Sequence, residues 1–150
     1  MNKFFEFNLN VELGEVFNEC TAYQISIEYL NKALDISNNL PINKYRLVKA
    51  YELRGKSKMF LNNEHQKINE QCWDLYWKAR KLNYLEAILD FSKAIEIDPK
   101  DSLLYFWRGF AYESLEEYPN AVKDLKIAKH LDPGFILTAS ILENIETKGF

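Results

Sequence analysis

The sequence predicts an all-α fold in which antiparallel helix pairs stack side by side into a superhelix. The first observation is a repeat, because two similar segments end at Pro99 and Pro133, which lie 34 residues apart. The second is that glycine (5) and proline (4) are scarce among the 150 residues, which leaves little room for hairpins. The matched positions are Ala87, Phe91, Ala94 and Asp98 in one segment, and Ala121, Leu125, Ala128 and Asp132 in the other. A helical repeat of this period indicates stacked helix pairs.

The most regular unit spans residues 100–133. It reads Tyr105-x-x-Arg108-Gly109-x-x-Tyr112, then Ala121-x-x-x-Leu125-x-x-Ala128, then Pro133. This resembles the tetratricopeptide repeat (TPR) family, whose pattern is large-x-x-Leu-Gly-x-x-Tyr, Ala-x-x-x-Phe-x-x-Ala, Pro. The small Gly109 and Ala121 let the paired helices approach closely, and Pro119 suits the first turn of the second helix. Arg108 departs from the pattern, since leucine is usual there.

Two further units precede it, at residues 7–40 and 42–99. The first reads Leu13-Gly14-x-x-Phe17, then Ser26-x-x-x-Leu30-x-x-Ala33. In the second, one register uses Tyr51-x-x-Arg54-Gly55 and pairs residues 42–62 with 84–98, whereas a rival register uses Leu47, Val48 and Tyr51. We prefer the first because the Arg-Gly pair recurs.

In that register an insertion near residues 64–83 separates the two helices of the second unit. It predicts a separate inserted helix that ends at Asn83, because one apolar stripe runs along it. The stripe consists of Ile68, Cys72, Leu75, Ala79 and Leu82. Residues 134–148 predict a C-terminal capping helix that covers the open end of the stack. The whole chain, 1–150, is therefore expected to be a single domain.

Composition excludes several classes of function. The net charge of −3 is too small to favour nucleic-acid binding, and no apolar run approaches the ~18 residues of a membrane helix. The N-terminus does not read as a secretory signal, so we expect a cytoplasmic protein. Cys20 and Cys72 have no metal-site spacing and are expected to be unpaired thiols.

Residues suited to catalysis are scarce. The sequence has no glycine-rich phosphate loop and no Gly-x-Ser-x-Gly motif. His65 and His130 are isolated and expected at the surface, and Asp124 is interpreted as an ordinary charge at a helix edge. We therefore expect no enzyme activity, no catalytic or metal-binding residue and no cofactor.

The resemblance to TPR proteins implies a working surface, because the first helix of each pair in that family lines a concave groove. The partner-binding positions it implies are Leu103, Phe106, Trp107 and Phe110 in the last unit, and Lys49, Glu52, Lys56, Met59 and Phe60 in the middle unit. A subset of the family clamps the terminal carboxylate of chaperone tails with lysine and asparagine. Here Val11 and Glu15 occupy those places in the first unit, and Phe106 and Phe110 those in the last, so the clamp is absent.

We expect a module that binds a partner protein or peptide, through an apolar or amphipathic segment, in this groove. Burial of the same aromatic rings under the inserted or C-terminal helix is the alternative for the groove. A structural subunit that forms a homodimer, or docks in an assembly, through Trp73, Tyr76 and Trp77 is the alternative function. A basic stretch over residues 44–58 suggests, more weakly, an acidic partner or nucleic acid. Its cations are Lys44, Arg46, Lys49, Arg54, Lys56 and Lys58.

Overall fold

Seven helices form the part of the fold that the structure describes. The computed structural model describes residues 2–61 and 73–149, apart from the side chains of residues 73–75, and within those ranges it contains no strand. The helices are α1 (Lys3–Glu19), α2 (Tyr23–Ser37), α3 (Lys44–Phe60), α4 (Trp73–Ile97), α5 (Ser102–Ser114), α6 (Tyr118–Leu131) and α7 (Ile136–Thr147). The all-α prediction is confirmed for the described residues.

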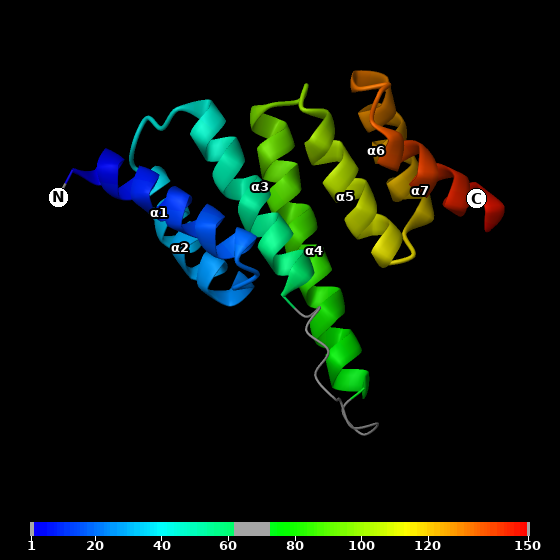
Figure 1. The fold of residues 1–150 in the computed structure, drawn as a ribbon, viewed down its shortest axis with the longest axis horizontal. Coiled ribbons are helices and arrows are strands. Elements are labelled where there is room, and N and C mark those ends of the chain that lie inside the picture. The colour runs from blue at the N-terminus through cyan, green and yellow to red at the C-terminus, as the bar shows by residue number, and fades with distance from the viewer. Residues whose placement is uncertain (1, 62–72, 150) are drawn as a thin grey trace.

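The helices pair in chain order and the pairs stack in a row. Helix α1 packs against α2, α3 against α4, and α5 against α6, and each pair contacts the next through α2 with α3 and α4 with α5. Figure 1 shows the row, with the two termini at opposite ends. Helices α1 and α3, and α3 and α5, also contact each other, so the first helices of the pairs form one continuous face. Helix α7 follows α6 as the predicted terminal helix.

Three glycines lie at the close approaches between paired helices. A Cβ atom added to Gly14 would lie 2.5 Å from Cγ of Leu30, and one added to Gly55 would lie 2.8 Å from the ring of Phe91. At Gly109 the same atom would lie 3.0 Å from Cγ of Leu125. Each first helix therefore rests on a large side chain of its partner where it has no side chain of its own. The contact of Gly55 agrees with the register that runs through Arg54-Gly55.

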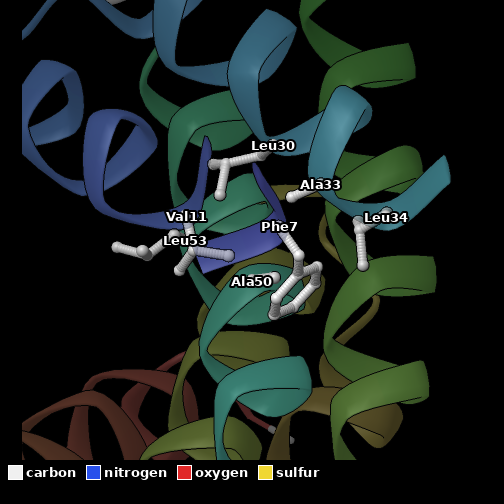
Figure 2. Packing of buried hydrophobic residues seen from close by; sticks show 7 residues of the cluster. All are labelled: Phe7, Val11, Leu30, Ala33, Leu34, Ala50 and Leu53. Carbon is white, nitrogen blue, oxygen red and sulfur yellow. The ribbon is translucent and has the colours of Figure 1, made fainter. Parts of the chain in front are cut away.

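The core is built mainly from those helix pairs. Figure 2 shows its first cluster, in which Phe7 and Val11 of α1 meet Leu30 and Ala33 of α2, with Leu34, Ala50 and Leu53 completing the group. A second cluster joins α3, α4 and α5, and a third joins α5, α6 and α7. Ala87 and Ala121, expected at meeting points between helices, are fully buried. The apolar interior is therefore continuous from one pair to the next.

Helix α4 differs from the prediction. It runs without interruption from Trp73 to Ile97. The prediction of a separate helix that ends at Asn83 is therefore wrong. The later part of the predicted insertion instead extends α4 at its N-terminal end, and Figure 1 shows this extension projecting beyond the rest of the stack. Residues 62–72, which include Ile68 and Cys72 of the predicted stripe, lie outside the described residues.

The helix ends follow from local chemistry. Asn2, Asn43 and Asp101 cap α1, α3 and α5, because each side chain accepts a hydrogen bond from the backbone N–H two residues on. Pro119 lies in the first turn of α6, as expected. The turn from α5 to α6 places Glu116 in the left-handed region, with φ of 63°. That conformation costs a side-chain-bearing residue about 1 kcal/mol or more.

Candidate functional site

The candidate surface is the face formed by α1, α3 and α5, which we call the inner face. Helix α3 lies at its centre, because α3 contacts α1 on one side and α5 on the other. The prediction placed its binding residues on α3 and α5. The structure brings these two groups together, since the ring of Phe60 on α3 meets that of Trp107 on α5 edge to face, with centroids 6.0 Å apart.

Two of the predicted residues are core residues. Met59 is 2% exposed and packs with Tyr84 and Phe91. Phe106 is 4% exposed, and the ring of Phe135 lies 4.7 Å from it. Phe106 also shares a cluster with residues of α7, so the alternative of burial under the C-terminal helix applies to this ring.

The remaining apolar residues are partly or well exposed. Leu103 is 42% exposed, and Phe60, Trp107 and Phe110 are half-buried. The rings of Trp107 and Phe110 lie edge to face with centroids 6.3 Å apart, and the ammonium of Lys56 lies 4.9 Å from the Trp107 centroid. The indole N–H of Trp107 is buried and donates to no acceptor among the described residues. Leu103, Trp107 and Phe110 form an apolar strip along α5, with Phe60 of α3 and the ammonium of Lys56 beside it.

Paired charges continue the inner face toward α1. The ammonium of Lys49 lies 2.7 Å from a carboxylate oxygen of Glu15, and Lys56 pairs with Glu52 one turn before it. Burial alone would lower the pKa of Lys49, but the hydrogen bond and charge of Glu15 outweigh it and raise that pKa above its ordinary value. The side chains of these four residues are therefore held in place by one another.

The predicted basic stretch is not a free cationic patch. Each of its six cations has a carboxylate oxygen within 4.0 Å of a side-chain nitrogen. The pairs are Lys44 with Asp98 (3.9 Å), Arg46 with Glu12 (3.4 Å), Lys49 with Glu15 (2.7 Å), Arg54 with Asp90 (2.6 Å), Lys56 with Glu52, and Lys58 with Asp90 (3.0 Å). Neutralised cations attract a polyanion weakly, so this stretch does not favour nucleic-acid binding.

An ion pair that the sequence did not reveal joins half-buried Arg54 of α3 to buried Asp90 of α4. Arg54 donates from Nε and Nη2 to the two carboxylate oxygens of Asp90, at 3.0 and 2.6 Å. Its Nη1 donates to Oδ1 of Asn31 on α2, at 2.7 Å. The arginine therefore joins its own helix pair to the preceding one.

The third helix pair repeats this arrangement. Arg108 donates from Nε and Nη2 to Asp124, at 2.6 and 2.9 Å, and from Nη1 to Oγ of Ser92 on α4, at 3.0 Å. Burial alone would lower the pKa of Arg108, and the hydrogen bond of Asp124 more than offsets it. The interpretation of Asp124 as an ordinary edge charge is wrong, because this residue is 2% exposed and paired. Asp124 directly precedes Leu125, the large residue that contacts Gly109. An aspartate at that position is the sequence signal that would have predicted the ion pair.

The α1–α3 junction carries a small polar network. Asn18 donates to Oγ of Ser57 at 2.7 Å, Ser57 and Ser26 share a hydrogen bond of 2.8 Å, and Ser26 donates to the carbonyl oxygen of Gly14. Ser26 and Ser57 are fully buried. Such a satisfied network fixes the spacing of α1, α2 and α3 and therefore the shape of the inner face.

A second apolar surface lies on α4, where the alternative function was placed. Trp77 is 54% and Leu89 66% exposed, and Leu82 and Leu85 are also exposed. Tyr76 is half-buried, and the side chain of Trp73 lies outside the described residues. The spacing of Leu82, Leu85 and Leu89 puts them on one face of the helix.

The described ranges contain neither a membrane-spanning helix nor a cluster of metal ligands. No helix there has the length and apolar character needed to cross a membrane. No group of three or more histidine, cysteine, aspartate or glutamate side chains there is arranged to hold a metal ion.

Comparisons with known proteins agree with this fold. A family model described as tetratricopeptide repeat matches residues 91–123. The chain is 32% identical over 130 residues to the Hsp70-Hsp90 organizing protein of Triticum aestivum, a match that covers 82% of this chain but only 21% of that relative. The Arabidopsis OM64 TPR domain has a similar fold, with a TM-score of 0.73, 17% identity, and coverage of 97% of this chain and 98% of that one.

Proposed function

Because the chain belongs to the tetratricopeptide repeat family, whose members generally mediate protein–protein interactions, we propose that it is a non-catalytic cytoplasmic binding module. Its inner face binds an apolar or amphipathic segment of a partner protein. The relative from wheat is named for organising Hsp70 with Hsp90, so a chaperone is the first partner to test.

The observation that carries the proposal is the apolar strip on α5. Leu103, Trp107 and Phe110 keep part of their surface in solvent. Their neighbours do not, because Met59 is buried against α4 and Phe106 against α7. Covering such surface is favourable by about 25 cal/mol per Å². Aromatic anchors on a rigid helix lose little conformational entropy on binding, which favours affinity.

The paired charges beside the strip would set the orientation in which the partner's segment binds. Glu15, Lys49, Glu52 and Lys56 alternate in sign along the face, and each is already held by a partner. An amphipathic segment would lay its apolar side on Leu103 and its charged side over this row. Fixed alternating charges select among partners more than they add affinity.

The same residues argue against capture of a chaperone by its terminal carboxylate. Val11 is fully buried, and Glu15 places a negative charge where a carboxylate would bind. A chaperone partner would therefore contact the inner face through an internal segment. Titration calorimetry with purified Hsp70 and Hsp90 tests this point, and deletion of their last residues should leave the affinity unchanged.

Site-specific photo-crosslinking tests the binding face itself. A photoreactive residue at position 103 should form adducts with a partner, while the same residue at position 25, on exposed α2 surface, should not. With the photoreactive residue at position 110, Leu103→Glu should reduce the adducts. Ile25→Glu is the matched control, because Ile25 and Leu103 are both 42% exposed. No adduct from position 103, or the same adducts from both positions, would contradict the proposal.

A second candidate function is self-association through α4, favoured by the exposed stripe of Leu82, Leu85 and Leu89. Residues at this spacing form the seam by which two helices pack. A second copy would cover the stripe on both chains at once, as in a two-fold interface. Sedimentation equilibrium should then give a dimer that Leu85→Glu converts to a monomer. A monomeric parent at 100 µM, roughly the concentration at which weak dimers are populated, would exclude this function.

A further inference from the structure

The extension of α4 forms one wall of a cavity at the C-terminal end of α5. The cavity measures about 420 Å³ and lies between α4 and the turn from α5 to α6. Trp77, Arg80, Lys81 and Tyr84 line it from α4, and Ser114, Leu115 and Glu116 line it from the turn. Its volume falls in the range of small-ligand sites, about 300–1,000 Å³. Helices α2 and α6, with 15 and 14 residues, are shorter than the 25-residue α4 and have no such extension.

Arg80 is the distinctive residue of this cavity. Arg46, Arg54 and Arg108 each contact a carboxylate, whereas within the described residues Arg80 has no carboxylate within 4.0 Å. Its guanidinium instead donates to the hydroxyls of Tyr84 and Tyr76, at 3.2 and 3.4 Å. A guanidinium has five N–H donors, so donors remain after these two bonds.

Aromatic rings hold the guanidinium in place. Its central carbon lies 5.4 Å from the Trp77 ring centroid and 5.6 Å from that of Tyr84. The hydrogen bond to Tyr84 raises the pKa of Arg80 above its ordinary value, so the group stays charged. A cation oriented in this way binds a planar anion at a lower entropic cost than a mobile lysine does.

The charges of the cavity select the anion. Arg80 and Lys81 supply two positive charges and Glu116 one negative charge, so the lining carries a net charge of about +1. That balance suits a monoanionic carboxylate, whereas a phosphate dianion would meet more repulsion from Glu116. Trp77, Tyr84 and Leu115 supply apolar walls beside the cations.

We propose that this cavity binds an acidic side chain of an extended peptide, with Arg80 and Lys81 holding the carboxylate and Trp77 and Leu115 contacting an adjacent apolar side chain. The cavity lining shares no residue with the apolar strip of the inner face, and binding here does not depend on the function proposed above. Arg80 forms charge-assisted, two-point hydrogen bonds to the carboxylate. Lys81 adds attraction from the exposed edge.

Titration of the full chain by NMR tests the proposal. The probe is a blocked pentapeptide, Gly-Leu-Glu-Leu-Gly, compared with its glutamine counterpart and with inorganic phosphate. The acidic peptide should shift the backbone amides of residues 114–116 and the Nε–H of Arg80. The glutamine peptide should bind roughly tenfold more weakly, since it lacks the charge-assisted bonds, and phosphate should also bind more weakly.

Variants separate the site from general charge effects. Arg80→Gln should weaken binding of the acidic peptide roughly tenfold, while Lys126→Gln, which removes the same charge from exposed α6 surface, should leave it unchanged. Glu116→Gln should strengthen binding, a gain that damage to the fold would not produce. Equal binding of both peptides, tighter binding of phosphate, or shifts confined to residues 103–110 would each overturn the proposal. The last outcome would leave the inner-face function intact.

Discussion

Adding one methyl group at Gly14, in Gly14→Ala, should lower the free energy of unfolding by about 2 kcal/mol because of its contacts with Leu30. The new Cβ would lie 2.5 and 2.7 Å from two carbons of Leu30, where carbon atoms normally lie about 3.5–4.0 Å apart. Leu30 is fully buried and has to move by roughly 1 Å. Such overpacking costs about 1–3 kcal/mol, and alanine returns about 1 kcal/mol over glycine within a helix.

The three equivalent glycines should rank by their contacts. Gly55→Ala meets the Phe91 ring at 2.8 Å and should cost about 1 kcal/mol. Gly109→Ala meets Leu125 at 3.0 Å and should change stability by less than about 1 kcal/mol. Gly134→Ala, whose closest contact is 3.4 Å, is the control and should be neutral. Urea unfolding followed by circular dichroism at 222 nm measures the series.

Two results would refute this reasoning. A Gly14→Ala variant more stable than the parent would mean that α1 and α2 do not approach as closely as the structure has them. A double-mutant cycle with Leu30→Ala should give a coupling of at least about 1 kcal/mol, because the smaller side chain removes the clash. Simple additivity would show that the cost at Gly14 comes from elsewhere.

Three further predictions concern single side chains. Asp124→Ala should lower the free energy of unfolding in urea by about 3 kcal/mol, because it leaves the half-buried Arg108 without its carboxylate. Adding Arg108→Leu should recover most of the loss, and a cumulative loss would disprove this. Glu116→Gly should raise stability by up to about 1 kcal/mol, since φ of 63° suits glycine, and a lower midpoint would contradict this. Asp101 has a pKa raised chiefly by burial, so its contribution to stability is full below the unfolded pKa and falls as pH rises through the folded pKa. Asp101→Asn, which can still cap α5, should therefore be more stable than the parent at pH 7 and lose that advantage in acid, as thermal melts at both pH values would measure.

The sequence predicted the architecture because small residues leave a visible spacing. Gly14, Gly109, Ala87 and Ala121 mark where helices meet, and all four are buried. The break at Asn83 was wrong because asparagine costs a helix only about 0.7 kcal/mol. Arg80 contacts Tyr76 and Tyr84 one turn away on either side, which supports the helix across that position.

The candidate site was harder to predict, because burial depends on what packs next. Phe106 and Phe110 lie one turn apart on α5, yet Phe135 and α7 cover only the first of them well. Asp124 resembled a surface charge because its partner Arg108 lies 16 residues earlier on another helix. The sequence pattern shows which side of a helix a residue occupies. Whether that side is exposed to solvent depends on how the neighbouring helices pack against it.

The two bridging arginines have a mechanical consequence. Arg54 reaches back to Asn31 and Arg108 to Ser92, so each repeat is locked at a set angle to its predecessor. The curvature of the solenoid is thereby fixed before any partner binds. The chain is therefore expected to present a rigid surface and not to change its curvature around the partner. A partner must match the existing pitch.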